Sequence, residues 1–178
     1  MPIIKITNQL LAQFVVDGFE HEIRSSQDTN IKNVNFSGKK KMHSFTQLLL
    51  TTTSGWICYV SPSYSGSVND LNLTSFPETN MKDKLFKGCS IIGDLGFRGA
   101  TGKGIVTMDH IDKEDKNTFK EVRSVVENTI AKIRKWKYAK QQYIKPTKEL
   151  HKAFNHHQKM IKIICALVNL FDQPIRIY

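Results

Sequence analysis

The stretch CSIIGDLGFRG, residues 89–99, decides the fold, because a short apolar run stops there on Asp94. Ile91 and Ile92 are β-branched and are flanked by residues that favour turns, a pattern that predicts a short buried strand. The glycines that follow let the backbone turn sharply beside Asp94. Two interpretations fit this carboxylate: it caps the next helix or closes a turn, or it is one member of a set of metal ligands.

The composition favours a single intracellular domain with an anionic partner. A chain of 178 residues, 40% of them apolar, can bury one core, and a net charge of +10 favours nucleic acid over a neutral interaction partner. Cys58, Cys89 and Cys165 are odd in number and lack a Cys-x-x-Cys pattern, so we expect reduced core residues. No signal sequence opens the chain and no apolar run approaches the ~20 residues that span a bilayer. We therefore expect a soluble protein with no membrane partner.

Residues 10–16, LLAQFVV, form a nearly unbroken apolar run that leads into Asp17 and continues to residue 23. This pattern predicts a central strand that becomes solvent-facing part way along. Asp17 lies in the middle of that strand, where both β-propensity and desolvation disfavour a lone aspartate. Either the residue faces water at a strand edge, or its carboxylate has a function.

Residues 39–53 and 56–60 predict two strands that flank the tight-turn signal Ser54-Gly55. Together they make a hairpin, and with the first strand an antiparallel meander. The polar residues 24–38 between the first and second strands are typical of a loop.

After the hairpin the chain is expected to leave the sheet at residues 61–67. Residues 68–71 then predict the start of a helix, with Asn69 or Asp70 as its N-cap. Beyond the glycines of the opening stretch, residues 104–108 favour a short fifth strand.

A long amphipathic helix is predicted after the charged, loop-like residues 109–117. From Thr118, residues recur at helical spacing and define one buried stripe: Val122, Val125, Val126, Thr129, Ile130, Ile133 and Trp136. Glu127 lies at the edge of this stripe, near Arg123 and Arg134. Its carboxylate either reaches a cleft beside the sheet or is an ordinary solvated surface group.

Basic and aromatic residues alternate over residues 132–140, at the end of that helix. This pattern suits a phosphate backbone with stacking rings, but a charged outer helix face is equally ordinary. A last helical region is predicted over residues 147–171. His151, His156 and His157 within it lack the spacing of metal ligands, so we interpret them as surface or packing residues.

The predicted order of elements is that of a ribonuclease H-like α/β fold, with an antiparallel meander of three strands, one or two further parallel strands and flanking helices. In this mixed sheet the middle of the first strand lies beside the end of the fourth. Asp17 and Asp94 are therefore expected to meet, with Glu127 arriving from the helix packed over them. Three gathered carboxylates repel one another unless cations lie between them, so the arrangement predicts a metal site.

The sequence also resembles the DDE transposase/endonuclease superfamily, in the branch of the PIF/Harbinger transposases and related bacterial insertion-sequence enzymes. The resemblance covers residues 14–170 and rests on six motifs in the order of that family: VDG (16–18), FSGKKKMH (36–43), YVSPSYSGSVND (59–70), IGDLGFRG (92–99), RSVVE (123–127) and ALVNL (166–170). Each motif alone is weak, but the ordered set is specific.

This resemblance implies that Asp17, Asp94 and Glu127 are the catalytic triad and hold two divalent ions, Mg²⁺ or Mn²⁺. The implied reaction is phosphodiester hydrolysis at transposon ends, followed by strand transfer into target DNA. Asp70 and Arg123 are expected to support the site, Asp70 as an N-cap or by orienting a ligand. DNA contacts are expected from six basic residues: Lys39, Lys40, Lys41, Arg134, Lys135 and Lys137.

Residues 1–178 are expected to form one catalytic domain, with a core over about residues 14–171 and without the N-terminal DNA-binding region of that family. A separate DNA-binding protein and a second copy of the chain are therefore expected partners. The expected location is the nucleus in a eukaryote and the cytoplasm otherwise. Two other functions fit the residues: a domesticated or decayed transposase that binds DNA or protein without cutting, and a host ribonuclease H-like repair nuclease.

Overall fold

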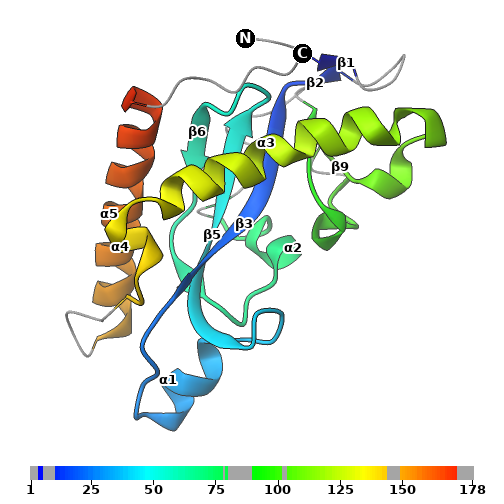
Figure 1. The fold of residues 1–178 in the computed structure, drawn as a ribbon. Helices are drawn as coiled ribbons and strands as arrows, with labels where there is room; N and C mark the ends of the chain where they lie inside the picture. The colour runs from blue at the N-terminus through cyan, green and yellow to red at the C-terminus, as the bar shows by residue number, and fades with distance from the viewer. Residues whose placement is uncertain are drawn as a thin grey trace.

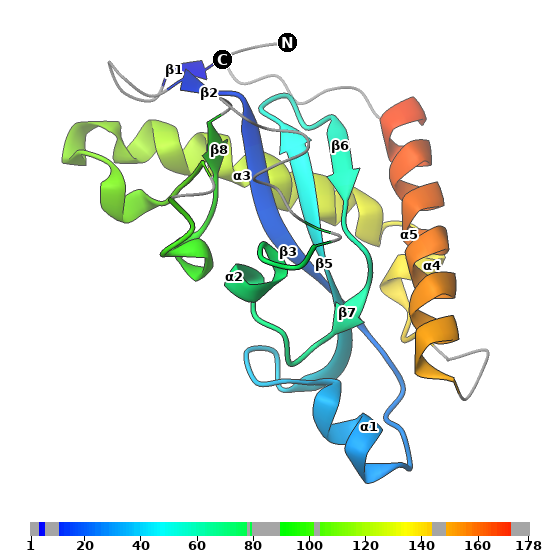
Figure 2. The same cartoon turned by 180° about the vertical axis from the view of Figure 1, so that it is seen from behind.

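The computed structural model describes residues 4–5, 11–77, 79, 90–101, 104–143 and 149–171. At its centre is a mixed β-sheet, with the long helix α3 (Lys116–Arg134) across one face and the short helix α2 (Asp70–Leu73) on the other (Figure 1, Figure 2). A second long helix, α5 (Leu150–Phe171), runs beside the strand β6 (Ile57–Val60).

The central strand is β3 (Phe14–Glu22), which pairs antiparallel along its whole length with β5 (Met42–Thr52). The other side of β5 pairs in turn with β4 (Phe36–Ser37), β7 (Tyr64–Ser65) and β6. Strands β3, β5 and β6 are the predicted antiparallel meander, which is confirmed.

Two short parallel strands complete the sheet, in the order β4-β5-β3-β8-β9. β8 (Ile91–Ile92) runs parallel to β3, and β9 (Ile105–Val106) runs parallel to β8. Both isoleucines of β8 are fully buried, as their β-branched side chains predicted. The fold is therefore the predicted ribonuclease H-like mixed sheet flanked by helices.

Helix α3 covers one face of the sheet with a continuous buried stripe: Phe119, Val122, Val125, Val126, Thr129, Ile130 and Ile133. All of them except Val125 and Thr129 share a core with Val15 and Phe19 of β3 and with the inner face of α5. Each large apolar side chain buried in this way contributes about 1.5–3 kcal/mol. The prediction that Trp136 continues the stripe is wrong, because α3 ends at Arg134 and Trp136 lies beyond it, 36% exposed.

The side chain of Asn169 on α5 closes the exposed edge of β6. Its Oδ1 accepts a hydrogen bond from the Ile57 backbone N–H, and its Nδ2 donates to the Ile57 carbonyl, both at 2.9 Å. The amide thus pairs with the backbone as a further strand would, which protects an edge that could otherwise recruit another chain. This contact accounts structurally for the asparagine in the last of the six motifs.

Other local predictions are wrong because short-range hydrogen bonds order segments that we expected to be irregular. Within the expected loop at residues 24–38, α1 (Thr29–Val34) starts at Asp28, whose Oδ1 accepts from the backbone N–H groups of Asn30 and Ile31. Within residues 61–67, where the chain was expected to leave the sheet, β7 returns to pair with β5. The charged residues 109–117 hold two 3₁₀ turns, η3 (Met108–His110) and η4 (Lys113–Asp115), and the first residues of α3.

The cysteine prediction holds only in part. Cys165 is a buried free thiol, but Cys58 is exposed because it alternates with the buried Ile57 on the edge strand β6. Leu10 and Cys89 lie outside the described residues.

The small pair β1 (Ile4–Lys5) and β2 (Leu11–Ala12) precedes the main sheet. Among the described helices, none is long and apolar enough to span a membrane.

Candidate active site

The site forms where the central strand β3 loses one of its neighbours. Within the described residues, β8 pairs with β3 only at Phe14 and Val15, so beyond Val15 the strand has β5 on one side and an open edge on the other until Glu22, whose carbonyl accepts from the Tyr143 N–H. Asp17 lies two residues after Val15, and Asp94 lies two residues after Ile92, the pairing partner of Val15. Because paired parallel strands advance together, the two aspartates reach the same level at the point where the strands part.

Side-chain alternation directs Asp17 toward α3. Val15 and Phe19 belong to the core that α3 covers, and the period of two along a strand places Asp17 between them on the same face. Glu127 lies on the flank of α3 and lines the same cavity as Asp17. Its carboxylate forms an ion pair with Arg123, one helical turn earlier.

Asp94 caps a helical turn and also lines the cavity. Its Oδ1 accepts a hydrogen bond from the Gly96 backbone N–H at 2.8 Å, at the start of the 3₁₀ turn η1 (Leu95–Phe97). The backbone before it is packed closely, because a Cβ on Gly93 would lie 2.9 Å from the Phe97 ring. The two sequence interpretations of Asp94 are therefore compatible.

Asp70 approaches the site from the other face of the sheet. It is the first residue of α2, and of the two residues predicted as N-cap it is Asn69 that caps the helix, so the other predicted role of Asp70, orienting a ligand, stays a prediction. Its carboxyl group lies against β3, because a Cβ on Gly18 would be 2.2 Å from Asp70 Oδ1. Its Oδ2 forms an ion pair with Lys39 Nζ at 3.3 Å. Only glycine at position 18 leaves room for this carboxylate.

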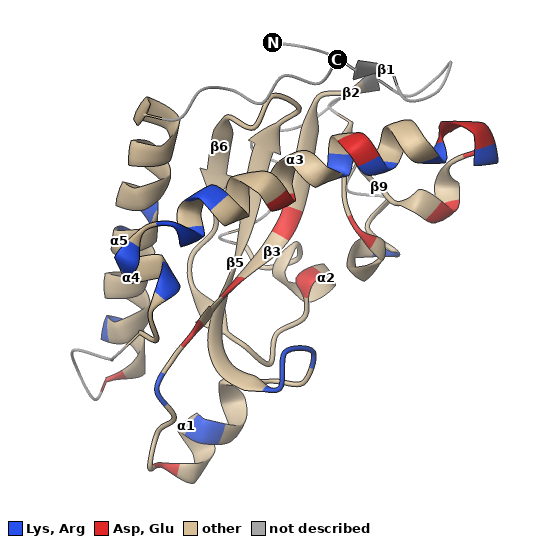
Figure 3. Ribbon diagram, in the orientation of Figure 1, with Lys and Arg blue, Asp and Glu red and all other residues tan. Residues whose placement is uncertain are grey.

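These side chains line one cavity of about 350 Å³, which we call the carboxylate cavity. Figure 3 shows acidic positions on β3, α2 and α3 near one another at the centre of the molecule. The carboxylates that line it are Asp17, Glu20, Asp70, Asp94 and Glu127, and the cations are Lys39, Lys40, Arg123 and Arg134.

Glu20 is the member of this set that sequence reasoning missed. Its Oε2 accepts a hydrogen bond from Ser44 Oγ at 2.8 Å, which ties it to β5. The available signal was its position three residues after Asp17 in a predicted central strand. The alternation of that strand places Glu20 on the opposite face from Asp17, so only the open edge of β3 lets both reach one cavity.

The carboxylates raise one another's affinity for protons. Burial raises the pKa of Asp17 to about 6. A hydrogen bond from the Gly18 N–H lowers this pKa, the charges of Asp94 and Asp70 raise it, and the charge of Arg123 lowers it. Burial and the charge of Asp94 also raise the pKa of Asp70, against the opposing effect of Lys39. The site therefore carries more negative charge than its own cations neutralise.

The donor chemistry fits a hard divalent cation. Carboxylate oxygens are the ligands that Mg²⁺ and Mn²⁺ prefer, and burial first, then the charges of Asp94 and Asp70, make the ionised form of Asp17 costly without a cation beside it. Within the described part of the chain, no group of three or more His, Cys, Asp or Glu side chains is close enough to hold a metal ion. Glu127 is instead bound to Arg123, so metal binding by the full set requires this side chain to change partner.

The basic residues expected to contact DNA fall into two groups. Lys39, Lys40 and Arg134 line the carboxylate cavity, and Arg134 and Lys135 also line an adjoining cavity of about 570 Å³. Lys140, which we did not predict, lines this second cavity as well. Lys41, with a positive φ of 55°, and Lys137 on α4 (Lys137–Lys140) are exposed and line neither.

The fold and this site define a class of nuclease-like proteins, and a family comparison agrees with it. The family model for the DDE superfamily endonucleases matches residues 16–169. The chain belongs to this family, whose members are DNA nucleases that generally use divalent metal ions. No curated protein and no solved structure matches the chain.

Proposed function

We propose that this protein is a divalent-metal-dependent DNA endonuclease and transposase of the PIF/Harbinger type. The observation that carries the proposal is the placement of Asp17 and Asp94 two residues beyond paired positions of parallel strands, where β3 opens to a cavity. A partly buried aspartate whose pKa is raised to about 6 beside further carboxylates is costly in a purely structural role.

In this proposal Asp17, Asp94 and Glu127 hold two Mg²⁺ or Mn²⁺ ions. When bound, such ions supply an activated water and stabilise the leaving 3′-oxygen of a phosphodiester. Asp17 is held for this task by its own backbone, because its Oδ1 accepts from the Gly18 N–H at 2.8 Å. Arg123 keeps Glu127 at the cavity until a ligand competes for it. Arg134, Lys40 and Lys135 bind the phosphates on either side of the cleaved bond.

The same geometry serves strand transfer, in which a DNA 3′-hydroxyl replaces water as the nucleophile. Transposon ends and target DNA are then successive substrates of one site. We further propose that residues 1–178 act as one catalytic domain, in the nucleus of a eukaryote or otherwise in the cytoplasm. Its partners are a separate protein that recognises transposon ends and a second copy of the chain.

The test is nicking of a supercoiled plasmid with Mg²⁺ or Mn²⁺, compared with the same reaction in EDTA. Asp94→Asn keeps the size of the side chain and an acceptor for the Gly96 N–H, but removes the charge, so we expect nicking to fall about 10³-fold. Asp112→Asn, at an exposed aspartate outside the cavity, is the matched control and keeps full activity. Equal nicking by Asp94→Asn would assign the cutting to a contaminant.

A second candidate is a decayed or domesticated transposase that binds DNA or protein without cutting. The observation that favours it is the pairing of Glu127 with Arg123, together with the lack of a gathered metal-ligand group in the described residues. This function predicts DNA binding that weakens steeply with salt and yields no metal-dependent product. Binding without nicking by purified wild-type protein would select it over the nuclease.

A further inference from the structure

A second cavity of about 440 Å³ lies beside the carboxylate cavity and shares four of its residues: Glu20, Lys39, Asp70 and Asp94. Its remaining walls come from residues 37–38 at the β4–β5 turn, residues 66–69 between β7 and α2, and Gly96 in η1. We call it the loop cavity. The ion pair between Lys39 and Asp70 stands where the two cavities adjoin.

The walls of the loop cavity differ in chemistry from those of its neighbour. Away from the shared residues the lining consists of Ser37, Ser67, Val68, Asn69 and glycines, and the buried Ser37 hydroxyl already accepts from the Lys40 N–H. The Asn69 oxygen already accepts from the Asn72 N–H, so its NH₂ group is left as a donor. Neutral donors, acceptors and a small apolar surface suit a sugar and base better than a metal ion or an apolar ligand.

The floor of this cavity is rigid before any ligand arrives. Gly66 N–H donates to the Ser44 carbonyl at 2.9 Å, and a Cβ on Gly66 would lie 2.2 Å from Ser44 Oγ. The facing turn is closed by the Lys41 N–H, which donates to the Ser37 carbonyl at 2.8 Å. A preorganised cavity costs less conformational entropy when it binds a ligand.

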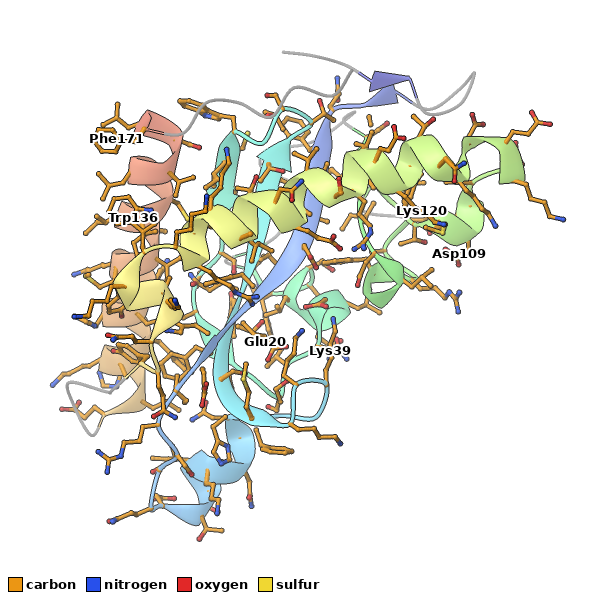
Figure 4. The ribbon with its side chains drawn as sticks, in the orientation of Figure 1. Glu20, Lys39, Asp109, Lys120, Trp136 and Phe171 are labelled. Carbon is orange, nitrogen blue, oxygen red and sulfur yellow. The ribbon has the colours of Figure 1, made fainter. Side chains whose placement is uncertain are left out.

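Lys39 is the cation placed to serve both cavities. Its side chain is 61% exposed, while its partner Asp70 is 14% exposed, so the ammonium group sits at the surface end of the pair. Figure 4 shows Lys39 and Glu20 next to one another in the space between β3 and the β4–β5 turn. A divalent ion beside Asp70 would weaken the attraction between this carboxylate and Lys39. The Lys39 ammonium group would then be free to bind a phosphate.

We propose that the loop cavity binds the nucleotide unit adjacent to the cleaved phosphodiester, with Lys39 as the contact to its phosphate. The proposal rests on the proposed action on DNA. A strand whose phosphate lies in the carboxylate cavity has to continue on both sides of it. The cavity of Arg134, Lys135 and Lys140 takes one side, and the loop cavity, whose volume is in the range of small-ligand sites, takes the other.

The test uses the trinucleotide d(TpTpT) as a probe, titrated into the full wild-type chain with Mg²⁺ and followed through backbone amide shifts by NMR. We expect shifts at Gly38, Gly66, Ser67 and Asn69. Ser67→Trp fills the cavity from an exposed position and should weaken probe binding about tenfold or more, whereas Ser25→Trp, at an exposed serine outside both cavities, should not change it. Lys39→Ala should weaken it by about tenfold, and the matched Lys32→Ala should have no effect.

Shifts confined to Arg134, Lys135 and Lys140, or equal weakening by the two tryptophan variants, would overturn the loop cavity as a nucleotide site. Neither result bears on plasmid nicking, which is measured separately. If wild-type protein fails to nick while the probe shifts the amides of residues 66–69 and Ser67→Trp abolishes this, the nuclease is refuted and the nucleotide site stands.

Discussion

The middle of strand β3 and its C-terminal end treat their polar groups in opposite ways. Asp17 and His21 lie four residues apart on the same face of the strand. His21 is 3% exposed, and both of its ring nitrogens have partners: Nδ1 lies 2.9 Å from His157 Nε2, and Nε2 lies 2.7 Å from the Gln141 carbonyl oxygen. Asp17 instead faces further carboxylates across an open cavity.

The hydrogen bonds of the histidines can be assigned throughout. A carbonyl only accepts, so His21 Nε2 carries the proton that it donates to Gln141, and His21 Nδ1 accepts from His157 Nε2. His157 Nδ1 then accepts from Ser63 Oγ at 2.8 Å. We call Ser63, His157 and His21 the histidine cluster. It links β3, α5 and the segment after β6 with neutral, satisfied groups.

The comparison teaches how to separate a structural polar group from a functional one. Burial lowers the pKa of His157 to about 3, with the nearby His21 and His156 acting in the same direction, and burial likewise lowers the pKa of His21, so both rings stay neutral. Burial raises the pKa of Asp17, the nearby Asp94 and Asp70 raise it further, and the Gly18 N–H and Arg123 offset this only in part. A buried polar group whose hydrogen bonds are satisfied stabilises a fold, whereas carboxylates gathered without full compensation mark a candidate ligand site.

The sharpest test of this contrast is Asp17→Asn. Removing the charge should reduce metal-dependent nicking by about 10³-fold, and should raise the metal-free unfolding free energy by about 2 kcal/mol at pH 7.5, because the neutral amide escapes the desolvation cost of burial and the repulsion of Asp94 and Asp70. Plasmid nicking and urea unfolding in EDTA measure the two effects. A metal-free protein that is less stable as the variant would mean that Asp17 has a structural role.

In the histidine cluster, His157→Ala should lower the unfolding free energy by about 3 kcal/mol. The substitution removes the hydrogen-bond partner of His21 and Ser63 and leaves a cavity where the ring was. His151→Ala, on the exposed side of α5, is the control and should change stability by less than about 0.5 kcal/mol. Urea unfolding measures both. If His157→Ala protein remains folded but loses nicking, the histidine cluster does not have a purely structural role.

Gly18→Ala tests the close approach of Asp70 to β3. The added methyl group would collide with the Asp70 carboxyl, so we expect a loss of about 2 kcal/mol in unfolding free energy. The double variant Gly18→Ala with Asp70→Ala should recover most of it, because the colliding oxygens are gone. Gly38→Ala, whose Cβ meets nothing within 4 Å, is the control. If the double variant is no more stable than Gly18→Ala alone, Asp70 does not lie where the structure places it.

In metal-free protein, the contributions of Asp17 and His157 to the unfolding free energy should also change with pH in opposite directions. The pKa of Asp17 is raised from 3.8 to about 6, so its contribution to the unfolding free energy falls as pH rises from about 4 to 6. The pKa of His157 is lowered from 6.5 to about 3, so its contribution falls as pH drops below about 6.5. When the pH is lowered from 6.5 to 5.5, the unfolding free energy of Asp17→Asn should therefore fall by about 1 kcal/mol more than that of wild type. The unfolding free energy of His157→Gln should fall by less than that of wild type. Parallel pH profiles for all three proteins would contradict this assignment.

Local sequence patterns predicted the elements that carry the site and failed where short-range capping decides. The alternation of β3, the β-branched pair Ile91 and Ile92, and the apolar period of α3 all gave the right element. Helix α1 was missed because its start depends on Asp28, whose side chain accepts from two backbone N–H groups. In the sequence, an aspartate that caps a helix cannot be told from one in a polar loop. Trp136 continued the apolar period past the true end of α3, because periodicity does not mark where a helix stops.

The sequence by itself determined that Asp17, Asp94 and Glu127 follow one another on a central strand, at the end of a parallel strand and on a helix, because hydrophobic period and turn residues are local properties. Only the tertiary structure decided what surrounds them. The short pairing of β8 opens the edge of β3, Gly18 admits Asp70 from the opposite face, and Glu20 and Lys39 join the same space. These contacts join residues far apart in the chain, and their cost in repulsion and desolvation arises only when the fold brings them together.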